Sequence, residues 1–358
     1  MSNPIHELQE LDQAVWLDSI RRSYLREGGY LPQLLEAGEL NGLASNPTIF
    51  QKALDAEDDY DEQLRELEGS DPRDAFWTIM KTDVGDACDL FRPLYDSSDG
   101  LHGLVSIEVD PSKAFDTEET VSEALLLYRE LDRPNLMVKV PGTEPGLGAI
   151  TRLIAEGVNV NVTLLFSVPR YEAVIEAYME GLRRRAEQNE DLASIRSVAS
   201  FFVSRVDSMV ADRVDADLPQ MATAGIANAR VAYGSFERVF GGSEFAELAD
   251  AGANVQRPLW ASTSTKDPDL PKTLYVEQLA GPQTVNTMPE ETLDAIREEA
   301  DVADRISGAA GEAAQQLQRL SEQGLDLEQV TKELESEGVE KFVNSFDEAV
   351  ETVARKLS

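Results

Sequence analysis

Residues 135–143 read Asn-Leu-Met-Val-Lys-Val-Pro-Gly-Thr, a short apolar run that ends in a Pro-Gly turn. Such a run predicts a buried β-strand, and Lys139 lies inside it. Because a charged ammonium is costly to bury, this environment favours the neutral amine, a nucleophile that can form a Schiff base with a carbonyl compound. The alternative is a lysine at a strand end whose head group reaches water.

Short β-like runs alternate with longer helical patterns along most of the chain, which predicts βα units and a parallel sheet. The predicted strands are 14–19, 42–45, 104–109, 136–140, 158–163, 197–203, 259–262 and 275–278. These eight runs are the number that closes a parallel barrel. An open doubly wound sheet is the alternative, but it calls for a glycine-rich loop after the first strand, and residues 14–22 contain no glycine. The predicted fold is α/β, a (β/α)8 TIM barrel with additional helices, notably at the C-terminus.

Local signals mark several helix boundaries. Asp71 before Pro72 and Ser167 before Pro169 predict helix starts, whereas glycines at 157 and 252 predict helix ends.

The chain is predicted to form a single domain over residues 1–358, because no repeat, low-complexity segment or linker divides it. The barrel core is expected at about 14–300, and a helical C-terminal extension at about 301–358. Gly308, Gly324 and Gly338 are the expected breaks in that extension.

Acidic residues dominate the charge balance, with 67 Asp and Glu against 32 Lys and Arg, a net charge of −35. Such a field repels nucleic acid and anionic membranes, so neither is expected as a partner. The charge fits either an ordinary acidic protein or one adapted to a salt-rich cytoplasm, where salt screens self-repulsion. We favour the salt-adapted interpretation. The sequence makes no prediction of oligomeric state.

Compartment signals favour the cytoplasm. Cys88 is the only cysteine, which excludes an internal disulfide and favours a reducing compartment. The N-terminus lacks a basic region followed by an apolar one, and no apolar run approaches the roughly 18 residues that cross a bilayer. We therefore expect a cytoplasmic protein.

The predicted strands end in polar residues, whereas the interior of an ordinary barrel is filled with branched aliphatic side chains. In parallel barrels, catalytic groups come from the C-terminal ends of the strands, so this polar set predicts a ligand site. Its members are Asp18, Asn46, Glu108, Lys139, Asn161, Thr163, Ser200, Arg205, Ser262, Ser264 and Lys266. Taken singly, each has a structural explanation, such as a turn residue before Pro47 for Asn46.

Three of these residues have the types that Schiff-base chemistry requires. Such an enzyme needs an amine, a group that moves protons during imine formation, and a second acid–base group for breaking the carbon–carbon bond. Lys139, Glu108 and Asp18 provide them from three predicted strands. The only histidines are His6 and His102, so no metal site is expected.

Seven stretches of the sequence together resemble a known family, transaldolase, in particular the branch of this length in actinobacteria and cyanobacteria. They include Ala-Ser-Asn-Pro-Thr-Ile-Phe at 44–50, and the others are 105–111, 136–143, 157–167, 200–207, 259–266 and 281–289. The resemblance implies a barrel enzyme of the pentose phosphate pathway that needs no cofactor. It would transfer a dihydroxyacetone unit from a ketose phosphate, sedoheptulose 7-phosphate or fructose 6-phosphate, to an aldose phosphate. Sugar phosphates are the partners implied.

By this resemblance, Lys139 is the Schiff-base lysine. Asp18 resembles the residue that takes the proton of a sugar hydroxyl as the carbon–carbon bond breaks. Glu108 resembles the residue that assists carbinolamine formation and dehydration through a water. Asn46 and Asn161 resemble residues that bind the dihydroxyacetone hydroxyls.

The resemblance also implies neighbours for these groups and a phosphate site. Thr163 and Ser200 are the implied neighbours of the two asparagines, and the phosphate site is implied at Arg205 with Ser262, Ser264 and Lys266. Better-known transaldolases have an arginine near Lys266, and lysine keeps the charge but loses the two-pronged guanidinium. Two alternatives stay open: an enzyme like fructose 6-phosphate aldolase, which releases dihydroxyacetone to water, and a non-catalytic sugar-phosphate-binding barrel.

Overall fold

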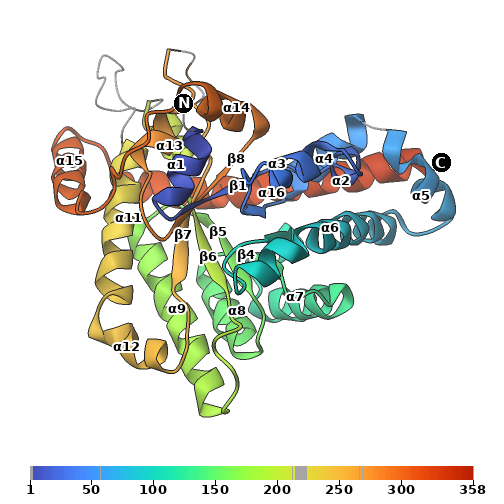
Figure 1. Cartoon of the computed structure of the whole chain (residues 1–358), viewed down its shortest axis with the longest axis horizontal. Coiled ribbons are helices and arrows are strands. Elements are labelled where there is room, and N and C mark those ends of the chain that lie inside the picture. Colours follow the sequence, from blue (N-terminus) through green and yellow to red (C-terminus); the bar gives the residue numbers. More distant parts are fainter. Residues whose placement is uncertain are drawn as a thin grey trace.

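The strands close into a parallel barrel. The computed structural model describes residues 3–56, 58–211, 213, 224–265, 267 and 269–357, and the barrel follows the chain order β1-β2-β3-β4-β5-β6-β7-β8. Every pairing is parallel, and β1 pairs with β8 to close the ring. Helices lie around this barrel, and the C-terminal helix extends to one side of it (Figure 1). The predicted (β/α)8 barrel with additional helices is confirmed.

The strands are short and fully buried. They are β1 (Gln13–Leu17), β2 (Gly42–Leu43), β3 (Leu104–Glu108), β4 (Leu136–Pro141), β5 (Val160–Leu165), β6 (Ser197–Phe202), β7 (Gln256–Ala261) and β8 (Thr284–Met288).

Helices follow most strands and extend both ends of the chain. They are α1 (Pro4–Glu10), α2 (Arg22–Leu25), α3 (Tyr30–Glu36), α4 (Pro47–Ala56), α5 (Asp61–Glu66), α6 (Pro72–Ser97), α7 (Thr117–Leu131), α8 (Glu144–Ala155), α9 (Val168–Glu187), α10 (Ser204–Ala211), α11 (Ala224–Phe240), α12 (Ser243–Asp250), α13 (Leu274–Gln278), α14 (Glu290–Glu299), α15 (Ala310–Glu322) and α16 (Leu327–Lys356). Within the ranges that the structure describes, no helix is long and apolar enough to cross a membrane.

The alternation of strand side chains divides the core in two. One face of each strand, with residues such as Val15 and Val138, packs in an apolar cluster with the surrounding helices. The other face, with residues such as Trp16 and Met137, belongs to a second cluster that also contains Phe342 of α16. Since successive strand residues point to opposite faces, the sheet is buried on both sides, as in other parallel barrels.

The predicted helix boundaries are confirmed. Asp71 caps α6 by accepting from the backbone N–H groups of the first turn, and Ser167 caps α9 in the same way. Gly157 and Gly252 have φ of +89° and +95°, a left-handed conformation that glycine adopts without a steric penalty.

The prediction for the eighth strand is wrong. Residues 275–278 belong to helix α13, and the eighth strand is Thr284–Met288. The side chains of Tyr275 and Val276 are buried, and the Tyr275 hydroxyl donates to the Asp207 carboxylate at 2.8 Å. The aromatic and β-branched side chains that predicted a strand here are therefore explained by the burial of a helix. The true strand carries three polar residues among its five, which conceals it in the sequence.

The C-terminal extension is confirmed as helical, but one of its expected breaks is wrong. Gly308 and Gly324 lie between helices with φ of +70° and +99°, whereas Gly338 lies inside α16. A Cβ at Gly338 would lie 3.0 Å from Leu164 Cδ2 of β5. Leu164 itself has φ of +60°, at a register shift between β5 and β6. The glycine lets α16 approach this bulged strand closely, which is a packing role and not a break.

We predict that Gly338→Leu lowers the free energy of unfolding by about 1–3 kcal/mol, because the added side chain overpacks the contact with Leu164. Gly311→Leu in α15 is the matched control, since a Cβ there has nothing within 4 Å. Urea denaturation of both variants measures the difference. Equal effects of the two substitutions would contradict a close contact at Gly338.

Candidate active site

A cavity of about 640 Å³ opens where the strands end, and α16 forms part of its wall. Seven of the residues predicted from the sequence line it: Asp18, Asn46, Lys139, Ser200, Arg205, Ser262 and Ser264. Glu108, Asn161 and Thr163 are buried and are not part of the lining. Lys266 lies outside the residues that the structure describes.

Lys139 points into the barrel and not toward bulk water. Its side chain is 6 % exposed, and Nζ lies 3.3 Å from Glu108 Oε2. Nζ also donates to the Ser45 carbonyl at 3.3 Å. The strand register produces the pair, because Glu108 of β3 is aligned with Lys139 of β4. The alternative of a lysine reaching past a strand end to water is therefore wrong.

Burial raises the pKa of Glu108 to about 7, and the nearby Lys139 lowers it in part. The contact with Lys139 is an ion pair and not an aligned hydrogen bond. Neither carboxyl oxygen has a hydrogen-bond partner among the residues with described side chains. With a pKa near 7, both the acid and the carboxylate are populated at neutral pH, so Glu108 can both give and take protons.

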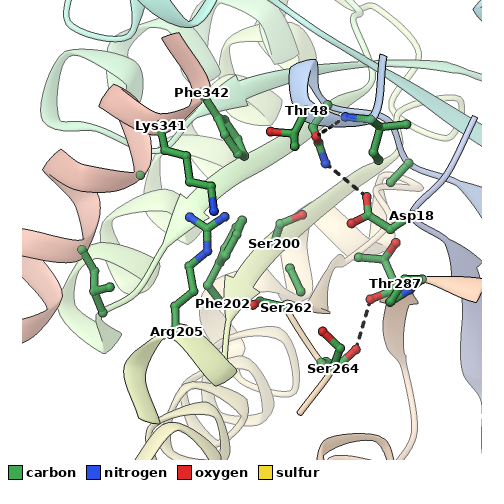
Figure 2. A pocket seen from close by; sticks show the side chains of 18 of the residues that line it. Asp18, Thr48, Ser200, Phe202, Arg205, Ser262, Ser264, Thr287, Lys341 and Phe342 are labelled. Carbon is green, nitrogen blue, oxygen red and sulfur yellow. Dashed lines mark hydrogen bonds between the residues drawn. The ribbon is translucent and has the colours of Figure 1, made fainter. Parts of the chain in front are cut away.

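Asp18 follows β1 and lines the cavity on the side opposite Arg205 (Figure 2). Burial raises its pKa, and Lys139, Arg205 and Lys52 each oppose that shift. Asn46 Nδ2 donates to Asp18 Oδ1 at 3.5 Å, a long contact. Asn46 also has the structural role expected of a residue before Pro47. Its Oδ1 accepts from the Ile49 N–H at 3.1 Å at the start of α4. That bond fixes the amide beside Asp18.

Asn161 lies at the centre of a buried hydrogen-bond chain. Ser200 Oγ donates to its Oδ1 at 2.7 Å, and its Nδ2 donates to Ser106 Oγ at 3.0 Å. Asn161 is aligned with Lys139 in the β4–β5 register, so the amide lies next to the amine along the sheet. Thr163 Oγ1 is buried without a hydrogen-bond partner in the described part of the chain. Sequence reasoning missed Ser106, a strand-interior serine whose only signal was its polarity between apolar residues.

Arg205 lies in the first turn of α10 beside two aromatic rings. Its Cζ is 5.0 Å from the centre of the Phe202 ring and 5.9 Å from that of Phe342. Burial lowers its pKa, and the carboxylates of Asp18 and Glu108 oppose that shift. Because the face of an aromatic ring attracts a cation, Phe202 and Phe342 help to hold the guanidinium in place.

Both serines of the predicted phosphate segment line the cavity. Ser262 has φ of +56°, a strained conformation for a residue other than glycine, and its hydroxyl lies 2.8 Å from Ser204 Oγ. The Ser204 N–H also donates to the Ser262 carbonyl at 3.0 Å, so the two segments meet next to Arg205.

The sequence left open whether the C-terminal helices cover the barrel mouth or mediate association, and it indicated none of the α16 residues that contribute to the cavity. Leu334, Glu337, Lys341 and Phe342 of this helix line the cavity. The Phe342 ring centre is 5.8 Å from Lys139 Nζ, so this ring covers the amine. No local signal in the sequence connects a phenylalanine of the C-terminal extension with a lysine 203 positions earlier.

A buried lysine paired with a carboxyl group, at the mouth of a parallel barrel, is the arrangement of an enzyme that uses an amine as its nucleophile. The chain belongs to the Transaldolase/Fructose-6-phosphate aldolase family, whose model matches residues 15–353. This confirms the resemblance seen in the sequence.

Curated relatives named Transaldolase match the chain over nearly its whole length. The relative from Parafrankia sp. (strain EAN1pec) is 47 % identical over 369 residues, which cover 100 % of this chain and 99 % of the relative. The relative from Thermobifida fusca is 46 % identical over 366 residues, with the same coverage. That from Mycolicibacterium smegmatis is 46 % identical over 352 residues, covering 96 % and 95 %. The protein is thus an enzyme of the transferase class.

We predict that Lys139→Met raises the pKa of Glu108 above 7, because the nearby cation that lowers it is removed. Infrared difference spectra of the carboxyl band, taken across pH 5–9 and compared with those of Glu108→Gln, report this titration. Lys113→Met, which removes a cation paired with Glu123 instead, should leave the pKa of Glu108 near 7. An unchanged or lower pKa in Lys139→Met would contradict the pairing.

Proposed function

We propose that the protein transfers a dihydroxyacetone unit from a ketose phosphate to an aldose phosphate through a Schiff base on Lys139. The donor would be sedoheptulose 7-phosphate or fructose 6-phosphate, and the reaction would belong to the pentose phosphate pathway. The observation that carries the proposal is the buried Lys139 amine within 3.3 Å of a carboxyl group with a pKa of about 7. Membership of the family and the names of its relatives support the same reaction.

In the first step, the Glu108 carboxylate takes a proton from the Lys139 ammonium, and the resulting amine adds to the ketone carbon and gives a carbinolamine. Glu108 then donates, through a water, the proton with which the carbinolamine hydroxyl leaves as a second water, so that a protonated imine forms. The carboxylate that remains takes a proton back when water later hydrolyses the imine. A carboxyl group with a pKa of about 7 suits both directions of transfer at neutral pH.

In the second step, the Asp18 carboxylate takes the proton of the hydroxyl on the carbon that becomes the aldehyde. The adjacent carbon–carbon bond breaks, its electrons move into the protonated imine, and an aldose phosphate leaves. An enamine stays on Lys139 and attacks the carbonyl carbon of the acceptor. In the proposal, Asn46 and Asn161 bind the hydroxyls of the retained unit, with Thr163 and Ser200 as their neighbours.

The phosphate would bind at the opposite end of the cavity from Asp18, at Arg205 with Ser262 and Ser264. The lining residues and the position of Arg205 in Figure 2 support this assignment. The role proposed for Lys266 in the same site rests on the sequence alone.

We also propose that the enzyme works in the cytoplasm as a single barrel domain without a nucleic-acid partner. The buried thiol of Cys88 and a net charge of −35 support this proposal.

We predict that Lys139→Ala abolishes turnover while the protein stays folded, because the nucleophile is lost but the barrel keeps its packing. Incubation with fructose 6-phosphate and borohydride, followed by mass spectrometry, should locate an adduct on Lys139 of the wild type. Lys113→Ala should keep both activity and adduct.

Substantial residual activity of Lys139→Ala would contradict the mechanism, and binding without an adduct would indicate a non-catalytic barrel. Release of dihydroxyacetone from fructose 6-phosphate alone, as fast as transfer to an added acceptor, would indicate an aldolase instead.

We predict that Asp18→Asn slows carbon–carbon bond cleavage by about a hundredfold or more, the usual contribution of a general base, and slows imine formation much less. Borohydride trapping measures imine formation, and release of the aldose phosphate measures cleavage. Asp294→Asn, an exposed residue of α14 paired with Arg297, is the control and should change neither step. Equal losses in both steps would contradict the role of Asp18.

A further inference from the structure

We infer that Lys341 of α16 is a second cation of the phosphate site and binds the substrate phosphate together with Arg205. The inference rests on the proposed function, because it concerns the phosphate of the same substrate. It assigns part of the specificity of the enzyme to the C-terminal helix.

The geometry brings two cations from distant parts of the chain to one place. Lys341 and Arg205 both line the cavity, and Figure 2 shows the Lys341 ammonium directed toward the Arg205 guanidinium. Two like charges that approach each other repel, whereas a phosphate dianion between them would convert this repulsion into two charge-assisted contacts. A phosphate bound between the two side chains would therefore be stabilised by both.

The neighbours of Lys341 in the chain hold this part of α16 in place. The next residue, Phe342, is 3 % exposed, and its ring centre lies 5.9 Å from Arg205 Cζ. One turn earlier, Gly338 lets the helix approach β5 closely. These two contacts hold this part of α16 beside the barrel, so that Lys341 lines the cavity.

The charge of the rest of the molecule makes such a pair necessary. With a net charge of −35, the protein repels an anionic sugar at long range. Glu337, one turn before Lys341, also lines the cavity and adds a negative charge there. Lys341 adds its charge to those of Lys52, Lys139 and Arg205, which also line the cavity, and so helps to balance a phosphate dianion.

The position of the pair also suggests how the substrate is oriented. Arg205 and Lys341 lie on one side of the cavity and Asp18 on the other (Figure 2). A sugar phosphate with its phosphate at the cation pair would extend its carbon chain toward Asp18 and Lys139. The cation pair thus orients the substrate as well as attracting it.

The test compares Lys341→Gln with Lys332→Gln, which removes the same charge from an exposed residue of the same helix outside the cavity lining. In Lys341→Gln, the KM for glyceraldehyde 3-phosphate should rise about tenfold with a smaller change in kcat, and the kcat/KM for unphosphorylated glyceraldehyde should stay unchanged. Lys332→Gln should match the wild type with both acceptors. Lys341→Arg should restore most of the affinity, because it keeps the charge.

Calorimetric binding of inorganic phosphate provides a readout that needs no turnover, and Lys341→Gln should weaken it by a similar factor. Unchanged phosphate binding and an unchanged KM in Lys341→Gln would overturn the inference. An equal loss with phosphorylated and unphosphorylated acceptors would also overturn it, since that result indicates displaced packing of α16. The proposed function fails separately, if the wild type forms no borohydride-trapped adduct on Lys139, whatever Lys341 does.

Discussion

The site depends on one constraint: an amine and a carboxyl group are buried side by side within a closed sheet. Glu108 and Lys139 occupy aligned positions of neighbouring strands, which sets Nζ 3.3 Å from Oε2. Burial disfavours the charge on Glu108 while the ammonium favours it, and the balance raises its pKa to about 7. If the register slipped by one residue, one of the two side chains would point into the helical layer and the pair would be lost.

The C-terminal helix maintains this burial. Phe342 of α16 lies over both Lys139 and Arg205, with its ring centre 5.8 Å from the amine and 5.9 Å from the guanidinium carbon. Its helix packs against α4 and α6 and reaches β5 through Gly338. A segment that follows the barrel in sequence therefore forms part of the active-site wall, and the strand ends alone do not complete the cavity.

The protein carries a large negative net charge, but several cations line its cavity. The net charge is −35, yet Lys52, Lys139, Arg205 and Lys341 all line the same cavity. Since the effect of a charge is strongest at short range and in poorly solvated surroundings, these few cations set the local preference for an anionic substrate. Dissolved salt screens the charges on the outer surface, but it weakens the attraction between the buried cations and an anionic substrate much less.

The sequence by itself determined the barrel and indicated most of the residues that the structure gathers where the strands end, because polar residues stand out where an ordinary barrel has aliphatic ones. Lys139, Glu108 and Asp18 were predicted in this way. The same rule concealed β8, because three of its five residues are polar. Gly338 was predicted as a helix break for a different reason, the general tendency of glycine to end helices, whereas its close approach to Leu164 is a tertiary contact. Only the tertiary structure decided that Glu108 contacts Lys139 and that Lys341 and Phe342 enter the cavity. Those contacts depend on how distant segments pack, and local residue patterns do not encode the spatial meeting of residues about 200 positions apart.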